Sequence, residues 1–456
     1  MESLMNDKVT IRVLMFPWLA YGHISPYLEL AKRLADRNFF IYLCSTPANL
    51  SSIKSKISEK LALKIQLIEL HLPVLPNLPA SYHTTNGLPP HLMPVLKYAF
   101  EMSTLKFSFI LKTIKPDLLI YDFLQPWAPL AAAAIKIPAV EFITSSSTMT
   151  AFMFHFFKTP DVEFPFPSIF YRDYEFVHRA KLLESTADEQ VKEIAFQGIE
   201  RSNGIVLVKG FEEVEGRYID YLSKLLGKKV VPVGALVSDP TVEVDETSEV
   251  MDWLDQKGEK STVFVSFGSE YFLKNDDMNE LAHGLEMSKV NFIWVVRFPK
   301  GEKIELEESL PEGFLGRVKG RGLVVRGWAP QNKILGHENI GGFISHCGCS
   351  SIMEGMYFGV PVIAMPMHLD QPINARLIEE LGIGSEVMRN KFGRLDRAAV
   401  AAVIQKVVVD SDGESIRIKS RALSDKMRMK RDAEIDDVVR EFEKLCSDSK
   451  RVSQLL

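Results

Sequence analysis

Short apolar runs rich in β-branched residues alternate with longer amphipathic stretches along most of this chain, and this alternation restricts the possible folds more than any other feature. Residues 9–18 (VTIRVLMFPW) and 39–45 (FFIYLCS) have the pattern of buried strands, and residues 25–37 between them place leucines and alanines on one helical face. The pattern continues with the run PDLLIYD at 116–122 and an alanine-rich stretch at 128–135. Because parallel strands are joined by crossover helices, the sequence predicts an α/β fold with a mostly parallel sheet.

The alternation stops and restarts once, which indicates two units of the same class. Residues 238–250 (SDPTVEVDETSEV) are acidic and rich in turn formers, as expected of a linker. We therefore predict an N-terminal domain at 1–237 and a C-terminal domain at 251–456 that ends in a charged helix. Open parallel sheets bind ligands at the carboxyl ends of their strands, so two facing sheets predict a ligand cleft between the domains.

Charge and composition exclude several classes of function. A net charge of −5 and a pI near 6.1 provide no basic footprint for nucleic acid or for an anionic membrane surface. The apolar run at 123–135 contains two prolines and is shorter than the roughly 20 residues of a membrane span, so we expect no stable membrane insertion. Four scattered cysteines are too few for a disulfide framework, and the N-terminus lacks the features of a secretory signal. We expect a cytoplasmic monomer.

The glycine-rich stretch at 341–359 (GGFISHCGCSSIMEGMYFG) carries the strongest chemical signal. It predicts a strand, a turn that contains Gly348, and a helix that begins at Ser350 or Ser351. Backbone N–H groups, the helix dipole and the serine hydroxyls then converge on the turn, and this combination binds phosphate or diphosphate.

Three further side chains extend this anion site toward a nucleotide. His346 at the strand tip adds a hydrogen-bond donor, Glu354 one helical turn later can accept bonds from vicinal ribose hydroxyls, and Trp328 offers a flat face to a base. A serine-capped turn without a ligand is the simpler alternative for the stretch taken alone. The HCGC run could also indicate a metal, although no second Cys/His pair lies nearby in the sequence.

Two N-terminal residues lie where a general base and its partner would be expected. His23 follows the first predicted strand, in a loop before a helix that starts near Ser25–Pro26, and imidazole is suited to deprotonate a hydroxyl near neutral pH. Asp122 ends the strand DLLIYD on the same rim, where a carboxylate would orient the imidazole and stabilise its cation. Asp117 precedes that strand and is expected at the opposite rim. A loop histidine that caps a turn is the alternative for His23 alone.

Residues 328–371 resemble the signature box of plant UDP-sugar-dependent glycosyltransferases. The shared motifs are WAPQ, IL, His337, GGF, SHCG, Ser351, EG, GVP, Pro366 and the closing DQ. The likeness extends to GHISP at 22–26, YDFLQPWA at 121–128 and SFGS at 266–269, and so covers most of the chain. It implies the GT-B fold, in which two Rossmann-like domains face each other, with the acceptor in the N-terminal domain and the donor in the C-terminal one. It also implies that His23 and Asp122 are the catalytic pair.

The resemblance further implies a role for each donor-site residue. Trp328 would stack on uracil, and the backbone of Ala329 would pair with the base. The other implied roles are ribose binding by Gln331 and Glu354, diphosphate binding by Ser269, His346, Ser350 and Ser351, and sugar binding by Asp370 and Gln371.

Two positions depart from the common pattern of that family. Cys349 stands where most members have tryptophan, which removes an aromatic wall near the sugar, and Ser350 stands where many have asparagine, which keeps a hydrogen-bonding group.

On the acceptor side, the phenylalanine-rich segment 151–171 and the proline-rich loop 71–93 favour a bulky hydrophobic molecule. Segment 151–171 fits a plain hydrophobic core equally well.

We therefore expect inverting, metal-independent transfer of glucose from UDP-glucose to a hydroxyl of a bulky hydrophobic small molecule, with no further cofactor. The negative charge of the leaving group would be stabilised by the helix start and by His346, so no metal ion is required. The Asp-x-Asp run at 410–412 has the spacing of metal-dependent glycosyltransferases but is expected to be a turn. The runs YDFLQPWAPLAA and SFGSEYFL resemble branch-forming members, which add a sugar to a sugar of a terpenoid or flavonoid glycoside. Direct glucosylation of an aglycone hydroxyl, and a nucleotide-sugar-binding regulatory protein without transfer, are the alternatives.

Overall fold

The computed structural model describes residues 10–176, 187–238, 248–269, 271–298 and 304–455. The strands of its N-terminal unit are β1 (Ile11–Phe16), β2 (Phe39–Ser45), β3 (Ile65–Glu69), β4 (Leu118–Tyr121), β5 (Ala139–Ile143), β6 (Ile205–Val208) and β7 (Lys229–Pro232). The helices of this unit are α1 (Tyr21–Ala35), α2 (Pro47–Lys54), α3 (Glu59–Ala62), α4 (Met93–Glu101), α5 (Thr104–Ile114), α6 (Ala128–Ala133), α7 (Ser147–Lys158), α9 (Ala187–Arg201) and α10 (Glu212–Leu226).

The C-terminal unit follows the same alternation. Its strands are β8 (Thr262–Ser266), β9 (Asn291–Val296), β10 (Gly322–Arg326), β11 (Ile340–Ser345), β12 (Val362–Ala364) and β13 (Gly384–Glu386). Its helices are α11 (Ser248–Asp255), α12 (Asn275–Ser288), α13 (Leu306–Ser309), α14 (Phe314–Arg317), α15 (Gln331–Leu335), α16 (Cys349–Phe358), α17 (Gln371–Leu381), α18 (Arg397–Val408) and α19 (Glu414–Met429), and the chain ends with α20 (Ala433–Leu455).

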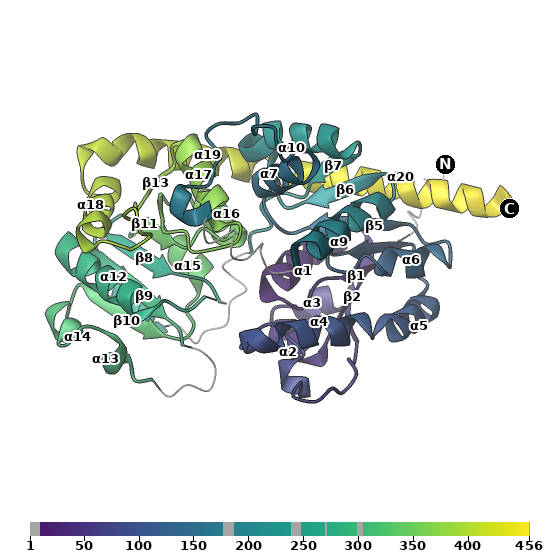
Figure 1. Ribbon diagram of the computed structural model, residues 1–456, viewed down its shortest axis with the longest axis horizontal. Helices are drawn as coiled ribbons and strands as arrows, with labels where there is room; N and C mark the ends of the chain where they lie inside the picture. The colour runs from purple at the N-terminus through teal and green to yellow at the C-terminus, as the bar shows by residue number, and fades with distance from the viewer. Residues whose placement is uncertain (1–9, 177–186, 239–247, 270, 299–303, 456) are drawn as a thin grey trace, which may run out of the picture.

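Each unit contains one parallel sheet, and the two units lie side by side (Figure 1). The N-terminal sheet has the order β3-β2-β1-β4-β5-β6-β7, and the C-terminal sheet has the order β10-β9-β8-β11-β12-β13. In the first sheet the strand order reverses at β1, which pairs with β2 on one side and with β4 on the other. Such a reversal opens a crevice beyond the carboxyl ends of the two strands, so it predicts where functional side chains gather.

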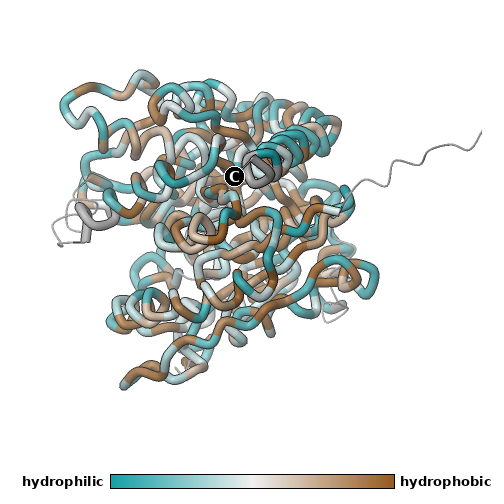
Figure 2. The backbone as a smooth tube through the Cα atoms, turned by 90° about the vertical axis from the view of Figure 1, so that its right-hand side faces the viewer, coloured by the Kyte–Doolittle hydropathy of each residue, from teal (hydrophilic) through white to brown (hydrophobic). Residues whose placement is uncertain are grey.

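Burial on both faces explains why the strands read as continuous apolar runs. In β1, Val13 and Met15 belong to a core cluster with α1, whereas Leu14 and Phe16 pack in a second cluster with α4, α5 and α6. Hydrophobic stretches run through the middle of the molecule (brown in Figure 2). The predicted α/β fold with two Rossmann-like domains is confirmed.

The terminal helix does not stay with the C-terminal unit, to which the predicted boundary 251–456 assigned it. Apolar side chains of α20, among them Val438 and Phe442, are fully buried in the core of the N-terminal unit. Arg37 of that unit also contacts Asp432 and Asp436 at 3.0 and 2.6 Å. Figure 1 shows this helix, in yellow, along the N-terminal unit. The spacing of its apolar residues predicted a helix, but the surface that covers its apolar face is set by tertiary packing.

The predicted linker is only partly described. Residues 239–247 lie outside the described residues, and residues 248–250 already belong to α11. A continuous hydrophobic cluster joins the units, with Phe152 and Val208 from the first and Met353 and Ile373 from the second. The domains therefore share a packed hydrophobic interface.

A buried ion pair also crosses this interface. Arg376 of α17 is almost fully buried and donates to Glu175 of the N-terminal unit at 2.9 Å and to Glu386 of its own unit. Together with Glu379 at 3.7 Å, these carboxylates offset the cost of removing the buried guanidinium from water.

Candidate active site

The predicted base and its partner lie in direct contact. His23 Nδ1 is 2.7 Å from Asp122 Oδ2, and the Asp122 side chain is fully buried while that of His23 is 22% exposed. Asp122 immediately follows β4, and the register pairs Phe16 of β1 with Tyr121 of β4. The carboxyl ends of these two neighbouring strands therefore bring together two residues that are 99 positions apart.

This contact determines what the other imidazole nitrogen can do. With Asp122 ionised, Nδ1–H donates to the carboxylate, which leaves Nε2 as the proton acceptor. Thr144, directly after β5, places its Oγ1 3.1 Å from the same Nδ1. The ring of Phe123 lies beside the imidazole, with 6.0 Å between the ring centroids. The arrangement thus has the geometry of an oriented general base.

The prediction that His23 lies in a loop before the helix is wrong. Helix α1 begins at Tyr21, and the carbonyl of Ala20 accepts from the N–H groups of both His23 and Ile24 at 3.0 Å. Pro26, which suggested the helix start because proline favours the first turn, is the sixth helical residue. His23 is therefore held on a regular helical turn.

Asp117 lies at the opposite rim of the sheet, as predicted. Its carboxylate accepts from the backbone N–H of Arg12 at 2.9 Å, and its own N–H donates to the Arg12 carbonyl at 2.7 Å. These bonds join the amino ends of β1 and β4, so Asp117 has a structural role.

The expected diphosphate turn forms between β11 and α16. Helix α16 begins at Cys349 with Gly348 as its N-cap residue, so its start is one residue before the predicted Ser350. Cys347 has a positive φ of 66° in this turn, and the carbonyl of Cys347 accepts from Asn374 Nδ2 at 2.9 Å. Ser350 and Ser351 are thus in the first turn of the helix, where the backbone N–H groups have no helical partners.

Two glycines define the space around the His346 ring. A Cβ on Gly348 would lie 2.6 Å from His346 Nε2, and a Cβ on Gly268, whose φ is +76°, would lie 2.8 Å from the same atom. Burial, followed by the nearby charge of His368, lowers the pKa of His346 to about 4. A neutral imidazole at physiological pH still offers one N–H donor to an anion.

The expected base and ribose residues lie together after β10. Gly327, with a φ of 91°, turns the chain so that Trp328 is 51% exposed while Ala329 is buried. Gln331 is the first residue of α15, and its amide nitrogen donates to the carboxylate of Glu354 in α16. An exposed indole beside an amide–carboxylate pair offers a stacking face and hydrogen-bonding groups for a nucleoside.

The expected sugar-binding residues begin α17. Asp370 is its N-cap residue, and Asp370 Oδ2 accepts from Asn374 Nδ2 at 2.8 Å. Gln371 is buried, and its Oε1 accepts from the N–H groups of Met367 and His368, both at 3.0 Å. The amide oxygen of Gln371 is therefore engaged within its own loop, and its NH2 group, which lies 3.4 Å from His368 Nδ1, has a second N–H that remains for a sugar hydroxyl. Ser269 lies in the loop after β8, partly exposed, next to Gly268.

Comparison with known proteins decides the family. A sequence profile described as "UDP-glucoronosyl and UDP-glucosyl transferase" matches residues 228–422, and one described as "Glycosyltransferase, N-terminal domain" matches residues 8–238. The chain is 51% identical over 443 residues to the beta-D-glucosyl crocetin beta-1,6-glucosyltransferase of Gardenia jasminoides, with 96% of this chain and 100% of the relative covered. This chain belongs to the plant UDP-glycosyltransferase family.

Two further comparisons agree with that assignment. The glycosyltransferase is 49% identical to a mogroside IIIx synthase of Siraitia grosvenorii, with 95% of this chain and 93% of the relative covered. The structure of Phytolacca americana UGT2 complexed with UDP-2fluoro-glucose and pterostilbene superposes with a TM-score of 0.80 at 26% identity, covering 96% and 100% of the two chains. The predicted family, the GT-B fold and a UDP-sugar-dependent enzyme are confirmed.

Sequence reasoning missed two residues of this glycosyltransferase that connect the domains. Lys209 immediately follows β6, is 2% exposed, and donates from Nζ to Ser350 Oγ at 2.6 Å. Asn374 accepts at Oδ1 from Ser146 of the N-terminal unit at 2.7 Å. The sequence contained a signal for Lys209, since this residue directly follows an apolar strand just as Asp122 does. The contact between Asn374 and Ser146 could not be predicted in this way, because it depends on how the domains pack.

The two segments expected at the acceptor side differ in their placement. In segment 151–171, Phe152, Phe154 and Phe164 are buried and pack edge-to-face with neighbouring rings, whereas Val162 and Phe170 are exposed, so only part of this segment belongs to the core. The proline-rich loop 71–93 instead contacts the chain before α1, because the N–H of Thr85 donates to the Leu19 carbonyl at 3.1 Å. The loop thus lies near the helix start that holds His23.

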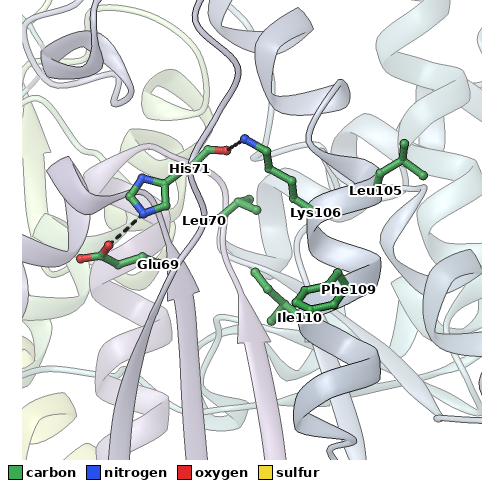
Figure 3. A pocket seen from close by; sticks show the side chains of 7 residues that line it. All are labelled: Glu69, Leu70, His71, Leu105, Lys106, Phe109 and Ile110. Atoms are coloured by element: carbon green, nitrogen blue, oxygen red, sulfur yellow. Dashed lines mark hydrogen bonds and ion pairs between the residues drawn. The ribbon is translucent and has the colours of Figure 1, made fainter.

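A surface pocket of about 430 Å3 lies elsewhere on the glycosyltransferase (Figure 3). It is lined by Glu69, Leu70, His71, Leu105, Lys106, Phe109 and Ile110, from the end of β3, the segment after it and α5. None of the individually predicted site residues lines it, although His71 is the first residue of the loop 71–93 that was expected on the acceptor side. Across the described ranges, no helix is both long and apolar enough to cross a membrane, and no group of three or more His, Cys, Asp or Glu side chains forms a candidate metal site.

Proposed function

We propose that this glycosyltransferase transfers glucose from UDP-glucose, with inversion, to a sugar hydroxyl of a terpenoid or flavonoid glycoside. The names of two relatives support this acceptor class, since one is a glucosyl crocetin β-1,6-glucosyltransferase and the other a mogroside IIIx synthase. We also propose that it acts as a monomer in the cytoplasm. All four of its cysteines are free and buried, which suits a reducing compartment.

The observation that carries the proposal is a continuous series of contacts between the base and the start of α16. His23 lies 3.1 Å from Thr144, and the residue before Thr144, Ile143, accepts from the N–H of Lys209 at 2.9 Å. Lys209 then reaches Ser350 at 2.6 Å. These short steps support a common site for an acceptor hydroxyl at the imidazole and a diphosphate at the helix start.

In the proposed reaction, Nε2 of His23 removes the proton from the acceptor hydroxyl. The acceptor oxygen attacks the anomeric carbon of the sugar while the bond from that carbon to the β-phosphate oxygen breaks. The electron pair of the broken bond stays on UDP, and attack opposite to the leaving group inverts the configuration. Asp122 stabilises the imidazolium that forms, because its buried carboxylate contacts Nδ1 at 2.7 Å.

The C-terminal unit would hold the donor through three groups of residues. Trp328 and the Ala329 backbone would bind uracil, and Gln331 with Glu354 would bind the ribose. The diphosphate would lie on Gly348, Ser269, His346, Ser350 and Ser351, and the sugar hydroxyls on Asp370 and the NH2 group of Gln371. Charge that develops on the departing UDP meets the amino end of α16, whose dipole and free N–H groups favour an anion.

The test offers UDP-glucose with matched acceptor pairs, each an aglycone and its monoglucoside from the terpenoid, apocarotenoid and flavonoid classes. Mass spectrometry counts the added hexoses, and NMR of the product reports the linkage and the anomeric configuration. We expect the monoglucosides to be elongated with a β-linked sugar. Elongation of aglycones alone would replace the branching proposal with direct glucosylation.

A matched variant tests the base. His23→Ala should abolish transfer while the affinity for UDP, measured by calorimetry, stays near that of the wild type. UDP binding by the wild type without transfer to any acceptor would favour a nucleotide-sugar-binding protein. Transfer by His23→Ala at the full rate would refute the assignment of the base.

A further inference from the structure

Lys209 occupies a functional position that the proposed donor contacts do not use. It is the residue directly after β6, on the rim where Asp122 follows β4 and Thr144 follows β5. Its side chain is buried to 2% exposure and leaves the N-terminal unit to reach the first turn of α16. A flexible lysine side chain loses rotamer freedom in such a place, so burial without a ligand would be costly.

The surroundings of Lys209 do not neutralise it by direct contact. Within the described ranges, Lys209 Nζ donates to the neutral Ser350 hydroxyl, and no carboxylate forms an ion pair with Lys209. Glu215 lies within electrostatic reach, but its Oε1 accepts from the backbone N–H and the hydroxyl of Thr148, both at 2.8 Å. Burial raises the pKa of Glu215 to about 7, so this carboxyl is partly protonated near neutrality.

The second nearby carboxyl, Asp370, accepts from Asn374 and from the backbone N–H of Cys349 at the start of α16. Its Oδ2 accepts from Asn374 at 2.8 Å, and burial raises its pKa while the Asn374 bond and the charge of Lys209 act in the opposite direction. A buried ammonium with only a hydroxyl partner is suited to an anionic ligand that arrives from outside the chain.

The bond to Ser350 points to where that anion would lie. Because Ser350 Oγ accepts from Lys209, the hydroxyl proton of Ser350 is free to be donated onward. This proton, the amine of Lys209 and the N–H groups of Ser350 and Ser351 in the first turn of α16 then surround the same small region, while the N–H of Cys349 is engaged by Asp370. We propose that Lys209 binds the β-phosphate of the donor from the N-terminal domain and stabilises the departing UDP.

The inference rests on the proposed function, because it assigns the diphosphate to the start of α16. When the bond between the anomeric carbon and the phosphate oxygen breaks, the electron pair remains on that oxygen. Lys209 donates a hydrogen bond to the phosphate, while the acceptor proton goes to His23. Positive charge from the acceptor domain thus helps the donor domain bind the nucleotide and stabilises UDP as the leaving group.

The experiment compares Lys209→Gln, which can still donate to Ser350 but has no charge, with Lys209→Met and Lys209→Arg. Calorimetry measures the affinities for UDP and for uridine, and initial rates give kcat with UDP-glucose. We expect Lys209→Gln to weaken UDP binding about 10- to 100-fold and to leave uridine binding unchanged. Its kcat should fall by about 10²-fold, with partial recovery in Lys209→Arg.

Lys228→Met is the matched control, because Lys228 is a partly buried lysine of the same domain whose Nζ donates to three backbone carbonyls. It should leave the preference for UDP over uridine as in the wild type. Equal weakening of UDP and uridine by Lys209→Gln, or an unchanged UDP affinity and kcat, would overturn the inference. A wild type without transfer would contradict the proposed function instead, and the UDP-to-uridine ratio would still test Lys209.

Discussion

Asp122→Asn tests how much of the catalysis depends on one buried negative charge. Asparagine has nearly the shape of aspartate and can accept a hydrogen bond, but it has no charge to stabilise the imidazolium of His23 and can hold the wrong tautomer. The contact between Nδ1 and Oδ2 is 2.7 Å, and Asp122 is fully buried, so little solvent screens the pair on the carboxylate side.

The size of the effect follows from this geometry. Taking the two charge centres as about 4 Å apart, an effective dielectric constant of about 20 gives about 4 kcal/mol of attraction between carboxylate and imidazolium. That energy is available in the transition state, where the imidazole has taken the acceptor proton, and is absent from the neutral ground state. Its loss corresponds to a decrease in kcat of roughly 10³-fold.

Initial rates at saturating UDP-glucose and a fixed glycoside acceptor measure this change, with UDP affinity followed separately by calorimetry. Asp117→Asn is the control, because Asp117 has the same side chain on the opposite rim and bonds to the backbone of Arg12. We expect its kcat to match that of the wild type. If Asp122→Asn folds, binds UDP normally and keeps more than about a tenth of the wild-type kcat, the electrostatic account of His23 is refuted.

Three other predictions follow from single side chains. Trp328→Ala should weaken UDP binding about tenfold without lowering the melting temperature, because the indole is 51% exposed and contributes little to the core. A large loss of stability would contradict this prediction. Gly268→Ala should lower both the UDP affinity and kcat, since the new methyl group would lie 2.8 Å from His346 Nε2 in a backbone conformation with φ +76°. Unchanged kinetics would show that the position of the His346 ring is unimportant. Glu215→Gln should make the free energy of unfolding less dependent on pH. Burial raises the pKa of this carboxyl to about 7 in the folded protein, against an ordinary value of 4.5. The stability that the carboxyl contributes is therefore complete below pH 4.5 and is lost as the pH rises to 7. Denaturant titrations at pH 4.5 and 8 should show about 3 kcal/mol less change in the variant than in the wild type, and equal changes would argue against a buried acid.

The sequence allowed a detailed prediction of a donor site because the residues of the proposed site are nearly continuous along the chain. Trp328, His346 and Glu354 all lie between positions 328 and 354, and the strand–turn–helix periodicity around them specifies their local geometry. The error in the start of α1 has a local cause, since Pro26 is an ordinary signal for a first turn, and here the helix extends five residues before it. The acceptor side was less predictable, because an aromatic segment such as 151–171 has the same composition whether it lines a pocket or fills a core.

The sequence by itself determined the alternation of strands and helices, the two-unit organisation and the chemical identity of the residues after each strand. Only the tertiary structure decided which of those residues meet. His23 touches Asp122 because β1 and β4 are neighbours although two strands lie between them in the chain, and Lys209 reaches Ser350 because the two domains pack together. Local periodicity depends on backbone geometry within a few residues, whereas these contacts depend on how apolar faces far apart in the sequence are buried against each other.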